Sequence, residues 1–187
     1  MTTEKDSSMM DALPEGWFDI RDALAYRELA NQLPDGGTIC ELGVWLGRSL
    51  CSIADIIKRK NLKVVVIDTF EGSLCDAEML TDAKKRDIQQ MFKDNLKSFG
   101  IEADVYKLTT TEASKLFADK TFDLVFIDAD HSYEAAKEDI KNWLPKTKGF
   151  IAGHDYYTWE GVTRAVNEAF ETVEHFGSVW CVDVITK

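Results

Sequence analysis

Short runs of apolar residues alternate along this chain with longer stretches in which apolar positions recur every three to four residues. The runs predict strands at 38–44, 64–70, 103–108, 122–128 and 150–153, because strands buried on both faces are apolar throughout. The intervening stretches predict helices over 20–33, 47–60, 76–99, 133–144 and 162–170. Two last strands are predicted near 171–176 and 179–186, joined by a Gly-Ser turn.

The order of these elements predicts the architecture. Strands alternate with helices through residue 170, which is typical of a parallel sheet covered by helices on both faces. The terminal strand pair cannot continue that pattern, so at least one late strand should be antiparallel. The 187 residues suffice for one domain, expected over 14–187, and the polar, aperiodic segment 1–13 is predicted to be disordered.

The composition limits the possible binding partners of the protein and its cellular compartment. A net charge of −11 and a pI of about 4.7 disfavour nucleic acid and anionic membranes, which both require a basic surface. The four cysteines lack a metal or redox spacing and are interpreted as free thiols in a reducing compartment. Neither a signal-peptide core nor a membrane-spanning apolar run is evident, so we expect a cytoplasmic protein.

The segment 38–49 carries the most informative pattern. An apolar strand leads into Glu41, then into a loop with Gly43 and Gly47, and then into a helix. Such glycines let the backbone approach a ligand, and a helix start presents free N–H groups. The Glu41 carboxylate would repel a pyrophosphate and attract an ammonium group, which favours S-adenosylmethionine. Alternatively, Glu41 is only a favourable charge at a helix N-terminus, and Ser49 either satisfies backbone donors or contacts the ligand.

Acidic residues lie at the ends of four of the five predicted parallel strands: Glu41, Asp68, Asp128 with Asp130 and His131 close behind, and Asp155 after His154. Ligands of open parallel sheets bind at the carboxyl ends of the strands. Asp68 lies 21 positions after Gly47, near the spacing at which an acid binds ribose hydroxyls, although a solvated strand-end aspartate is the alternative. The set therefore predicts one site at this edge of the sheet.

These residues together resemble a class I S-adenosylmethionine-dependent methyltransferase over about residues 17–186. Three segments carry the resemblance: 41–49, 66–72, and 122–133 with 153–156 downstream. The last is similar to small O-methyltransferases of the catechol, caffeoyl-coenzyme A and macrolide-sugar types. The resemblance implies a Rossmann-like sheet of seven strands, mostly parallel, with an antiparallel C-terminal strand.

The resemblance also implies a role for each site residue. Those implied to bind the cofactor are Glu41, Gly43, Gly47, Ser49, Asp68, Thr69, Phe70, Thr109, Thr110 and Asp128. Glu41 and the 43–47 loop would hold the methionine part, Asp68 the ribose, and the two threonines after the third strand the adenine. Asp128 would lie beside the point of methyl transfer, and His131 falls where relatives place a catalytic lysine or histidine.

A divalent ion is a further expectation. In metal-assisted relatives, the residue matching Asp128 binds an ion together with an acidic pair after the fifth strand. Asp155 matches the first member of that pair, and Tyr156 departs from the second. Asp128, Asp130 and Asp155 are hard oxygen ligands suited to Mg²⁺ or Ca²⁺, and without a cation three converging carboxylates would raise one another's pKa values.

Methyl transfer from a sulfonium to a hydroxyl requires alignment of the acceptor and removal of its proton. Histidine is suited to this near neutral pH, so His131 is the hypothesised general base, assisted by Asp128 or by the ion. We expect a small hydroxylated acceptor such as a sugar or phenol. Aromatic side chains that could border its pocket are Trp17, Phe18, Tyr156, Tyr157 and Trp159.

Three alternatives remain at this point. A nicotinamide-dependent dehydrogenase shares the sheet, but its G-x-G-x-x-G fingerprint is replaced here by Gly43-x-x-x-Gly47. A non-catalytic binding protein could retain the cofactor fold, and a related enzyme could use the same sheet for another reaction such as hydroxylation. A homo-oligomer is compatible with the sequence, which does not indicate its interface.

Overall fold

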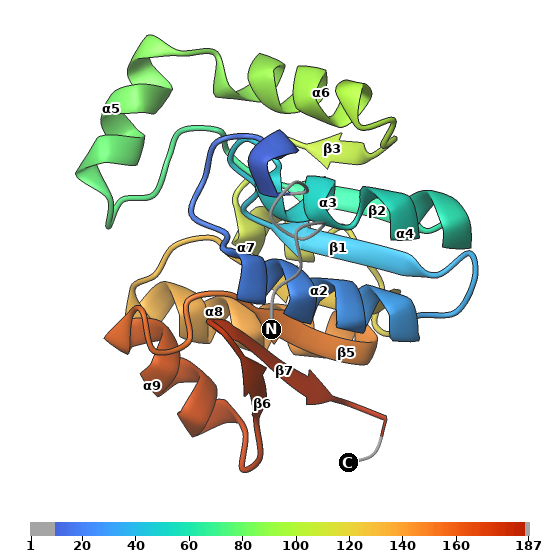
Figure 1. The fold of residues 1–187 in the computed structure, drawn as a ribbon. Helices are drawn as coiled ribbons and strands as arrows, with labels where there is room; N and C mark the ends of the chain where they lie inside the picture. The colour runs from blue at the N-terminus through green and yellow to red at the C-terminus, as the bar shows by residue number, and fades with distance from the viewer. Residues whose placement is uncertain (1–9, 186–187) are drawn as a thin grey trace.

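The computed structural model describes residues 10–185 and contains one seven-stranded sheet with helices on both faces (Figure 1). The sheet order is β3-β2-β1-β4-β5-β7-β6. The strands are β1 (Thr38–Leu42), β2 (Lys63–Ile67), β3 (Asp104–Tyr106), β4 (Phe122–Ile127), β5 (Thr147–Gly153), β6 (Glu174–Phe176) and β7 (Val179–Asp183). β1 to β5 are parallel, whereas β7 is antiparallel to both β5 and β6. The predicted fold class is confirmed.

Successive residues of the central strands face two different helical layers. Ile39 of β1 packs with α2 (Ile20–Gln32), α3 (Arg48–Ser52), α4 (Ala54–Lys60) and α6 (Ile88–Ser98). Its neighbour Cys40 packs on the other face with α7 (Thr110–Ser114), α8 (Tyr133–Trp143) and α9 (Glu160–Ala169). Because both faces of the strands are buried, these strands are continuously apolar rather than alternating.

Two predicted helices are each divided in the structure. The segment 47–60 breaks at Ile53, because the Arg27 guanidinium donates to the Ser52 carbonyl (2.6 Å), which a continuous helix would use internally. The segment 76–99 forms α5 (Ala77–Lys85) and α6, with Asp87 accepting a hydrogen bond from the Gln90 amide as the cap of α6. Both breaks depend on side-chain hydrogen bonds that periodicity does not reveal.

The N-terminal expectation requires a correction. Residues 1–9 of the predicted disordered segment lie outside the described residues, but residues 10–12 form a helical turn and Leu13 packs into the core. Arg48 donates hydrogen bonds to the carbonyls of Pro14 (2.6 Å) and Phe18 (2.8 Å), and these contacts tie the segment to the start of α3. No helix within residues 10–185 is both long and apolar enough to cross a membrane.

The topology places a site at one edge of the sheet. From β1 and β4 the chain builds the sheet outward in opposite directions, so their junction is the switch point. Leu42 pairs with Ile67 and with Ile127 at the ends of the neighbouring strands. The residues that follow these three strands therefore lie side by side.

Candidate functional site

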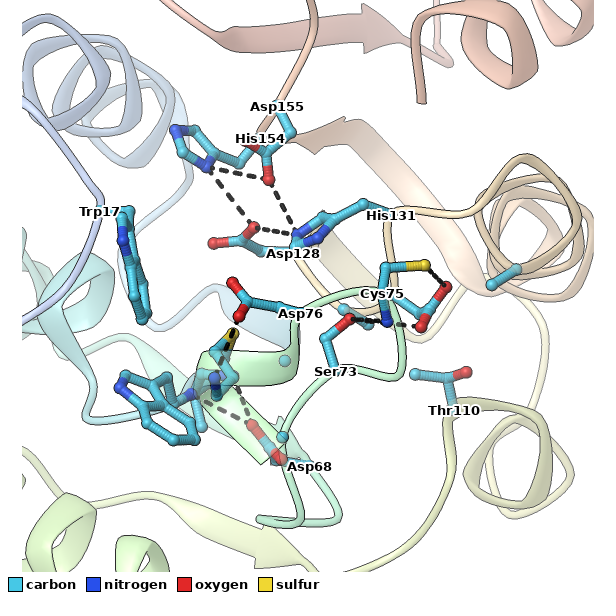
Figure 2. Close-up of a pocket in the computed structure, with 18 of the residues that line it drawn as sticks. Trp17, Asp68, Ser73, Cys75, Asp76, Thr110, Asp128, His131, His154 and Asp155 are labelled. Carbon is cyan, nitrogen blue, oxygen red and sulfur yellow. Dashed lines mark hydrogen bonds and ion pairs between the residues drawn. The ribbon is translucent and has the colours of Figure 1, made fainter. Parts of the chain in front are cut away.

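A cavity of about 1140 Å³ opens at the carboxyl ends of β1, β2, β4 and β5. Figure 2 shows its labelled side chains, with Asp68 at one end and Asp128, His131, His154 and Asp155 gathered at the other. Nine of the residues predicted to bind the cofactor, catalyse the reaction or bind a metal line it: Gly43, Ser49, Asp68, Thr69, Thr109, Thr110, Asp128, His131 and Asp155. Glu41, Gly47 and Phe70 do not line the cavity, and each has a structural explanation.

The loop after β1 approaches β4 so closely that only glycine fits at its first position. Gly43 has a φ of +76°, and a Cβ there would lie 2.1 Å from the Asp128 carbonyl oxygen. The Gly43 amide donates to the Ile67 carbonyl (2.8 Å), which joins the loop to β2 as well. Gly47 has a φ of +82° and packs instead against Phe92 and Leu96 of α6, so it supports the loop from behind.

Glu41 is completely buried and does not reach the cavity, which corrects the expectation that it pairs with an ammonium group. Like Ile39, it faces the layer of α2 and α3, because alternate residues of a strand share a face. Its carboxyl accepts hydrogen bonds from Tyr26 Oη (2.7 Å) and from Ser49 Oγ. Burial raises its pKa to about 8, above the usual 4.5, despite these two donors. Glu41 therefore acts as an uncharged structural link at pH 7.

This burial predicts a pH-dependent stability. Between pH 4.5 and 8 folded Glu41 keeps a proton that the unfolded chain releases, so the free energy of unfolding falls as pH rises through this window. Glu41→Gln removes that titration. We would measure the free energy of unfolding of both proteins with urea near pH 5 and at pH 8. The value for Glu41→Gln minus that for the parent should rise by on the order of 3 kcal/mol between the two pH values. The exposed Glu28→Gln is the control, and equal pH slopes for Glu41→Gln and the parent would refute the assignment.

Asp68 lines the cavity and also organises the loop beside it. Its Oδ2 accepts hydrogen bonds from the amides of Val44 (2.7 Å) and Trp45 (3.1 Å), and its Oδ1 accepts one from Phe70 (2.6 Å). Burial raises its pKa, and the three amides oppose that effect. A carboxylate offers about four acceptor positions, so one remains for a ribose hydroxyl.

The residues expected around the nucleoside divide into lining and supporting side chains. Phe70 is buried against Phe92 with ring centroids 5.6 Å apart, so it belongs to the core. Thr109 lines the cavity and caps α7 through a reciprocal pair of hydrogen bonds with Glu112. Thr110 also lines the cavity, and its carbonyl accepts a hydrogen bond from Trp143 Nε1 (3.2 Å).

Two carboxylates and two imidazoles meet after β4 and β5, and we call Asp128, His131, His154 and Asp155 the acid–imidazole cluster. Asp155 Oδ2 lies 2.9 Å from His131 Nε2 and 3.5 Å from His154 Nδ1. Asp128 Oδ1 lies 3.5 Å from His154 Nδ1 and 4.0 Å from His131 Nε2 (Figure 2). Asp155 has a φ of +64°, a strained value for a residue with a side chain, as found at functional sites.

His154 lies between carboxylates on both sides of its ring. Its Nε2 is 3.1 Å from Asp22 Oδ2 in α2, and its Nδ1 faces Asp128 and Asp155. Only the doubly protonated ring presents a proton, and with it a positive charge, to the carboxylates on both sides. Although burial disfavours the charge, the neighbouring carboxylates raise the His154 pKa to about 12. Sequence reasoning named His154 only as a strand-end residue and missed Asp22, which lies far from it in sequence.

His131 is held in the same cluster by a different set of contacts. Burial opposes its charge, but the hydrogen bond with Asp155 and the charge of Asp128 raise its pKa above the usual 6.5. Its ring stacks on Trp159 with centroids 4.9 Å apart and planes 18° apart. Burial would also raise the Asp155 pKa, but the two histidines hold it far below its ordinary value.

Asp130 does not join the cluster, which corrects the expected convergence of three carboxylates. It accepts hydrogen bonds from Ser73 Oγ (3.3 Å), Cys75 Sγ (3.4 Å) and the Ser132 amide (2.9 Å). Among the predicted aromatic residues, Trp17, Phe18 and Trp159 line the cavity. Tyr156 and Tyr157 do not, because Tyr156 is buried with its hydroxyl donating to Asn167 Oδ1 (2.7 Å) and Tyr157 points to solvent.

Sequence comparison identifies the family. A family model described as a methyltransferase domain matches residues 40–156, which run from β1 to the end of the site after β5. The chain belongs to the methyltransferase domain family. This confirms the resemblance to class I S-adenosylmethionine-dependent methyltransferases and displaces the dehydrogenase alternative. No curated protein matches the chain in sequence.

Solved structures share the fold at low sequence identity. The O-methyltransferase TomG from Streptomyces achromogenes, in complex with S-adenosylmethionine, is 14% identical with a TM-score of 0.61 over 97% of this chain and 89% of that chain. A precorrin-6y C5,15-methyltransferase from Geobacter metallireducens is 15% identical (TM-score 0.64, 91% of both chains). An rRNA methylase from Streptococcus thermophilus is 14% identical (TM-score 0.59, 86% and 93%). The fold of this methyltransferase is thus shared by proteins with different acceptors.

Proposed function

We propose that this methyltransferase transfers a methyl group from S-adenosylmethionine to a hydroxyl of a small molecule. The observation that carries the proposal is the acid–imidazole cluster, which lies in the same cavity as the Gly43 loop and Asp68. Family membership supports the methyl donor, as does the complex of TomG with S-adenosylmethionine. The cluster supports an acceptor whose proton must be removed, which a hydroxyl requires.

The residues of the cavity fit the proposed cofactor in shape and chemistry. The Gly43 loop approaches β4 without side-chain atoms, and Asp68 retains one acceptor position for a ribose hydroxyl. Thr109 and Thr110 line the same cavity and would face the adenine. Asp19, Asp22 and Asp128 line the part nearer the cluster, where carboxylates suit a cofactor that carries a sulfonium and an ammonium.

The chemistry follows from the position of His131. The acceptor oxygen forms a bond to the methyl carbon as the carbon–sulfur bond breaks, which leaves S-adenosylhomocysteine as the product. In the neutral ring, His131 Nε2 carries no proton and takes the one that the hydroxyl releases. The N–H formed then faces Asp155 Oδ2 at 2.9 Å, which stabilises the imidazolium. Asp128 lies 4.0 Å from the same nitrogen and lines the cavity, so an acceptor hydroxyl bound beside it can reach the imidazole.

The charge of the cavity favours some acceptors over others. Carboxylates dominate its lining, whereas the Arg48 guanidinium is directed to backbone carbonyls and both histidines are paired with aspartates. Phosphate-bearing acceptors and nucleic acid would be repelled there. We therefore infer an uncharged or cationic acceptor such as a sugar or a phenol, bordered by Trp17 and Trp159.

A divalent ion is the second candidate for activating the hydroxyl. Asp128, His131 and Asp155 offer three ligand atoms that all lie within 4.8 Å of one another. However, both carboxylates also lie 3.5 Å from His154 Nδ1. A divalent cation on the same oxygens would compete with the His154 imidazole for them, so we assign deprotonation to His131 and test for the ion by its removal.

The proposal is tested by methyl transfer from labelled S-adenosylmethionine to a panel of phenols, sugars and their phosphorylated counterparts. His131→Gln should lower kcat by about 10²- to 10³-fold and leave cofactor affinity unchanged, because only the proton acceptor is lost. His175→Gln is the matched control, since His175 does not line the cavity. Activity should survive EDTA. Transfer restricted to phosphorylated acceptors, unchanged turnover in His131→Gln, or abolition by EDTA with recovery on Mg²⁺ would each contradict a part of the account.

A further inference from the structure

A second, much smaller cavity of about 10 Å³ lies directly behind the acid–imidazole cluster, and we call it the rear cavity. Its walls are largely apolar, with Ala136 and Ile140 contributed by α8 and Val162 and Val166 by α9. His131 and Trp180 also line it, the latter from β7. Asp128, His131 and His154 of the cluster line both this cavity and the large one.

The rear cavity gathers polar atoms that have no hydrogen-bond partner. Within residues 10–185, four buried side-chain polar atoms lack one, and three of them belong to residues that line this cavity. One of the three, His154 Nε2, is ion-paired with Asp22 at 3.1 Å. The remaining two are His131 Nδ1 and Trp180 Nε1, and Trp180 is only 1% exposed.

Unpaired polar atoms of this kind are unfavourable in an apolar interior. A buried donor or acceptor without a partner loses the hydrogen bonds that it makes with water in the unfolded chain, and this loss destabilises the protein. A space of about 10–15 Å³ is the smallest that holds a water molecule, and a buried water requires two to four polar partners. Apolar cavities stay dry, whereas the rear cavity is lined by Trp180 and His131, whose Nε1 and Nδ1 atoms have no partner.

We propose that the rear cavity is a binding site for a single structural water that joins Trp180 Nε1 to His131 Nδ1. The water accepts the indole proton and forms the second hydrogen bond with the imidazole nitrogen, as donor or acceptor. His131 is then held on three sides: Asp155 binds Nε2 at 2.9 Å, Trp159 stacks on the ring, and the water binds Nδ1. Trp180 is thus a positioning residue that acts on His131 through the water.

This arrangement fixes the orientation of the His131 ring. Without a partner at Nδ1, the ring gains no hydrogen bond at that atom from its present orientation. The contacts with Asp155 and Trp159 act on its other nitrogen and on its face. With the water in place, each ring nitrogen has a partner. The kinetic consequence rests on the proposed function, whereas the site itself does not.

Ala136→Val tests the site, because it fills the rear cavity with apolar atoms and alters no polar group. In the parent, a high-resolution crystal structure should show one water bonded to Trp180 Nε1 and His131 Nδ1. In Ala136→Val that water should be absent, and the ¹⁵N signal of His131 Nδ1 should shift. The chain has three histidines, so this signal is resolvable, and His175 provides an internal reference. We expect kcat to fall about tenfold with little change in KM, as for one lost hydrogen bond.

Two further variants keep the result interpretable. Ala165→Val enlarges a buried side chain of the same core that does not line the rear cavity, so it should leave the Nδ1 signal unchanged. Trp180→Phe removes the indole donor and should also shift the Nδ1 signal. It replaces Ala136→Val as the test if that variant does not fold. A parent structure without this water, or an Nδ1 signal unaffected by both cavity variants, would overturn the proposal. If these signals change but no methyl transfer is found, the proposed function fails while the water site stands.

Discussion

Replacing Gly43 with alanine is expected to abolish binding of S-adenosylmethionine. The new Cβ would lie 2.1 Å from the Asp128 carbonyl oxygen, on a backbone with a φ of +76° that disfavours any side chain. Backbone, not a flexible side chain, must move to relieve this contact. The loop and the end of β4 would separate, and Asp128 would leave the acid–imidazole cluster. We expect affinity to fall more than about 100-fold and the free energy of unfolding by about 3–5 kcal/mol.

Gly36 provides a matched control for this prediction. It has a similar φ of +73° at the opposite end of β1, but a Cβ there meets no atom within 4 Å. Gly36→Ala should therefore lower the free energy of unfolding by only about 1–2 kcal/mol, the contribution of the backbone conformation alone. Binding measured by calorimetry should remain at the parental level. Equal losses of affinity in the two variants would show that the close approach of loop and strand does not shape the site.

Asp155→Asn is expected to lower kcat by about 10²- to 10³-fold while cofactor affinity changes little. Asparagine retains the shape of the side chain but cannot balance charge on His131 or His154, which lie 2.9 and 3.5 Å from the carboxylate oxygen. Because Asp155 helps to raise the pKa of His131, its loss should lower that pKa and weaken the imidazole as a base. The measurement is single-turnover methyl transfer with saturating cofactor across pH.

A control aspartate separates this effect from a general change in charge. Asp183 on β7 lies outside the cavity, so Asp183→Asn should leave turnover at the parental level. If Asp155→Asn transfers methyl groups at the parental rate, the acid–imidazole cluster has no part in the chemistry. If it instead loses cofactor affinity with normal turnover, Asp155 belongs to the binding surface rather than to deprotonation.

The architecture was predictable because strands buried on both faces of the sheet are apolar at nearly every position. The five apolar runs predicted the parallel strands, and the Gly177-Ser178 turn predicted the terminal hairpin. The divided helices were not predictable in the same way. The break at Ile53 depends on Arg27, which is distant in sequence and bonds the Ser52 carbonyl. The spacing of apolar residues shows which face of a helix is buried. It does not show which backbone carbonyl accepts a hydrogen bond from a side chain distant in sequence.

The site was predictable in position but only partly in role. Strand-end acids placed Asp68, Asp128 and Asp155 in one cavity, as the switch-point rule requires. The role of Glu41 was wrong because a residue one position before a strand end faces a helix layer instead of the ligand. The pairing of His154 with Asp22 joins β5 to α2 across most of the chain, and no local pattern indicates it.

Calorimetric titration of the folded protein with S-adenosylmethionine tests the central claim most directly, namely that the cavity between β1 and β4 binds this cofactor. The account predicts saturable binding at one site in the parent and in Asp155→Asn, and its loss in Gly43→Ala. A folded parent that releases no heat with S-adenosylmethionine, or that binds it equally well after the Gly43 substitution, would contradict the account.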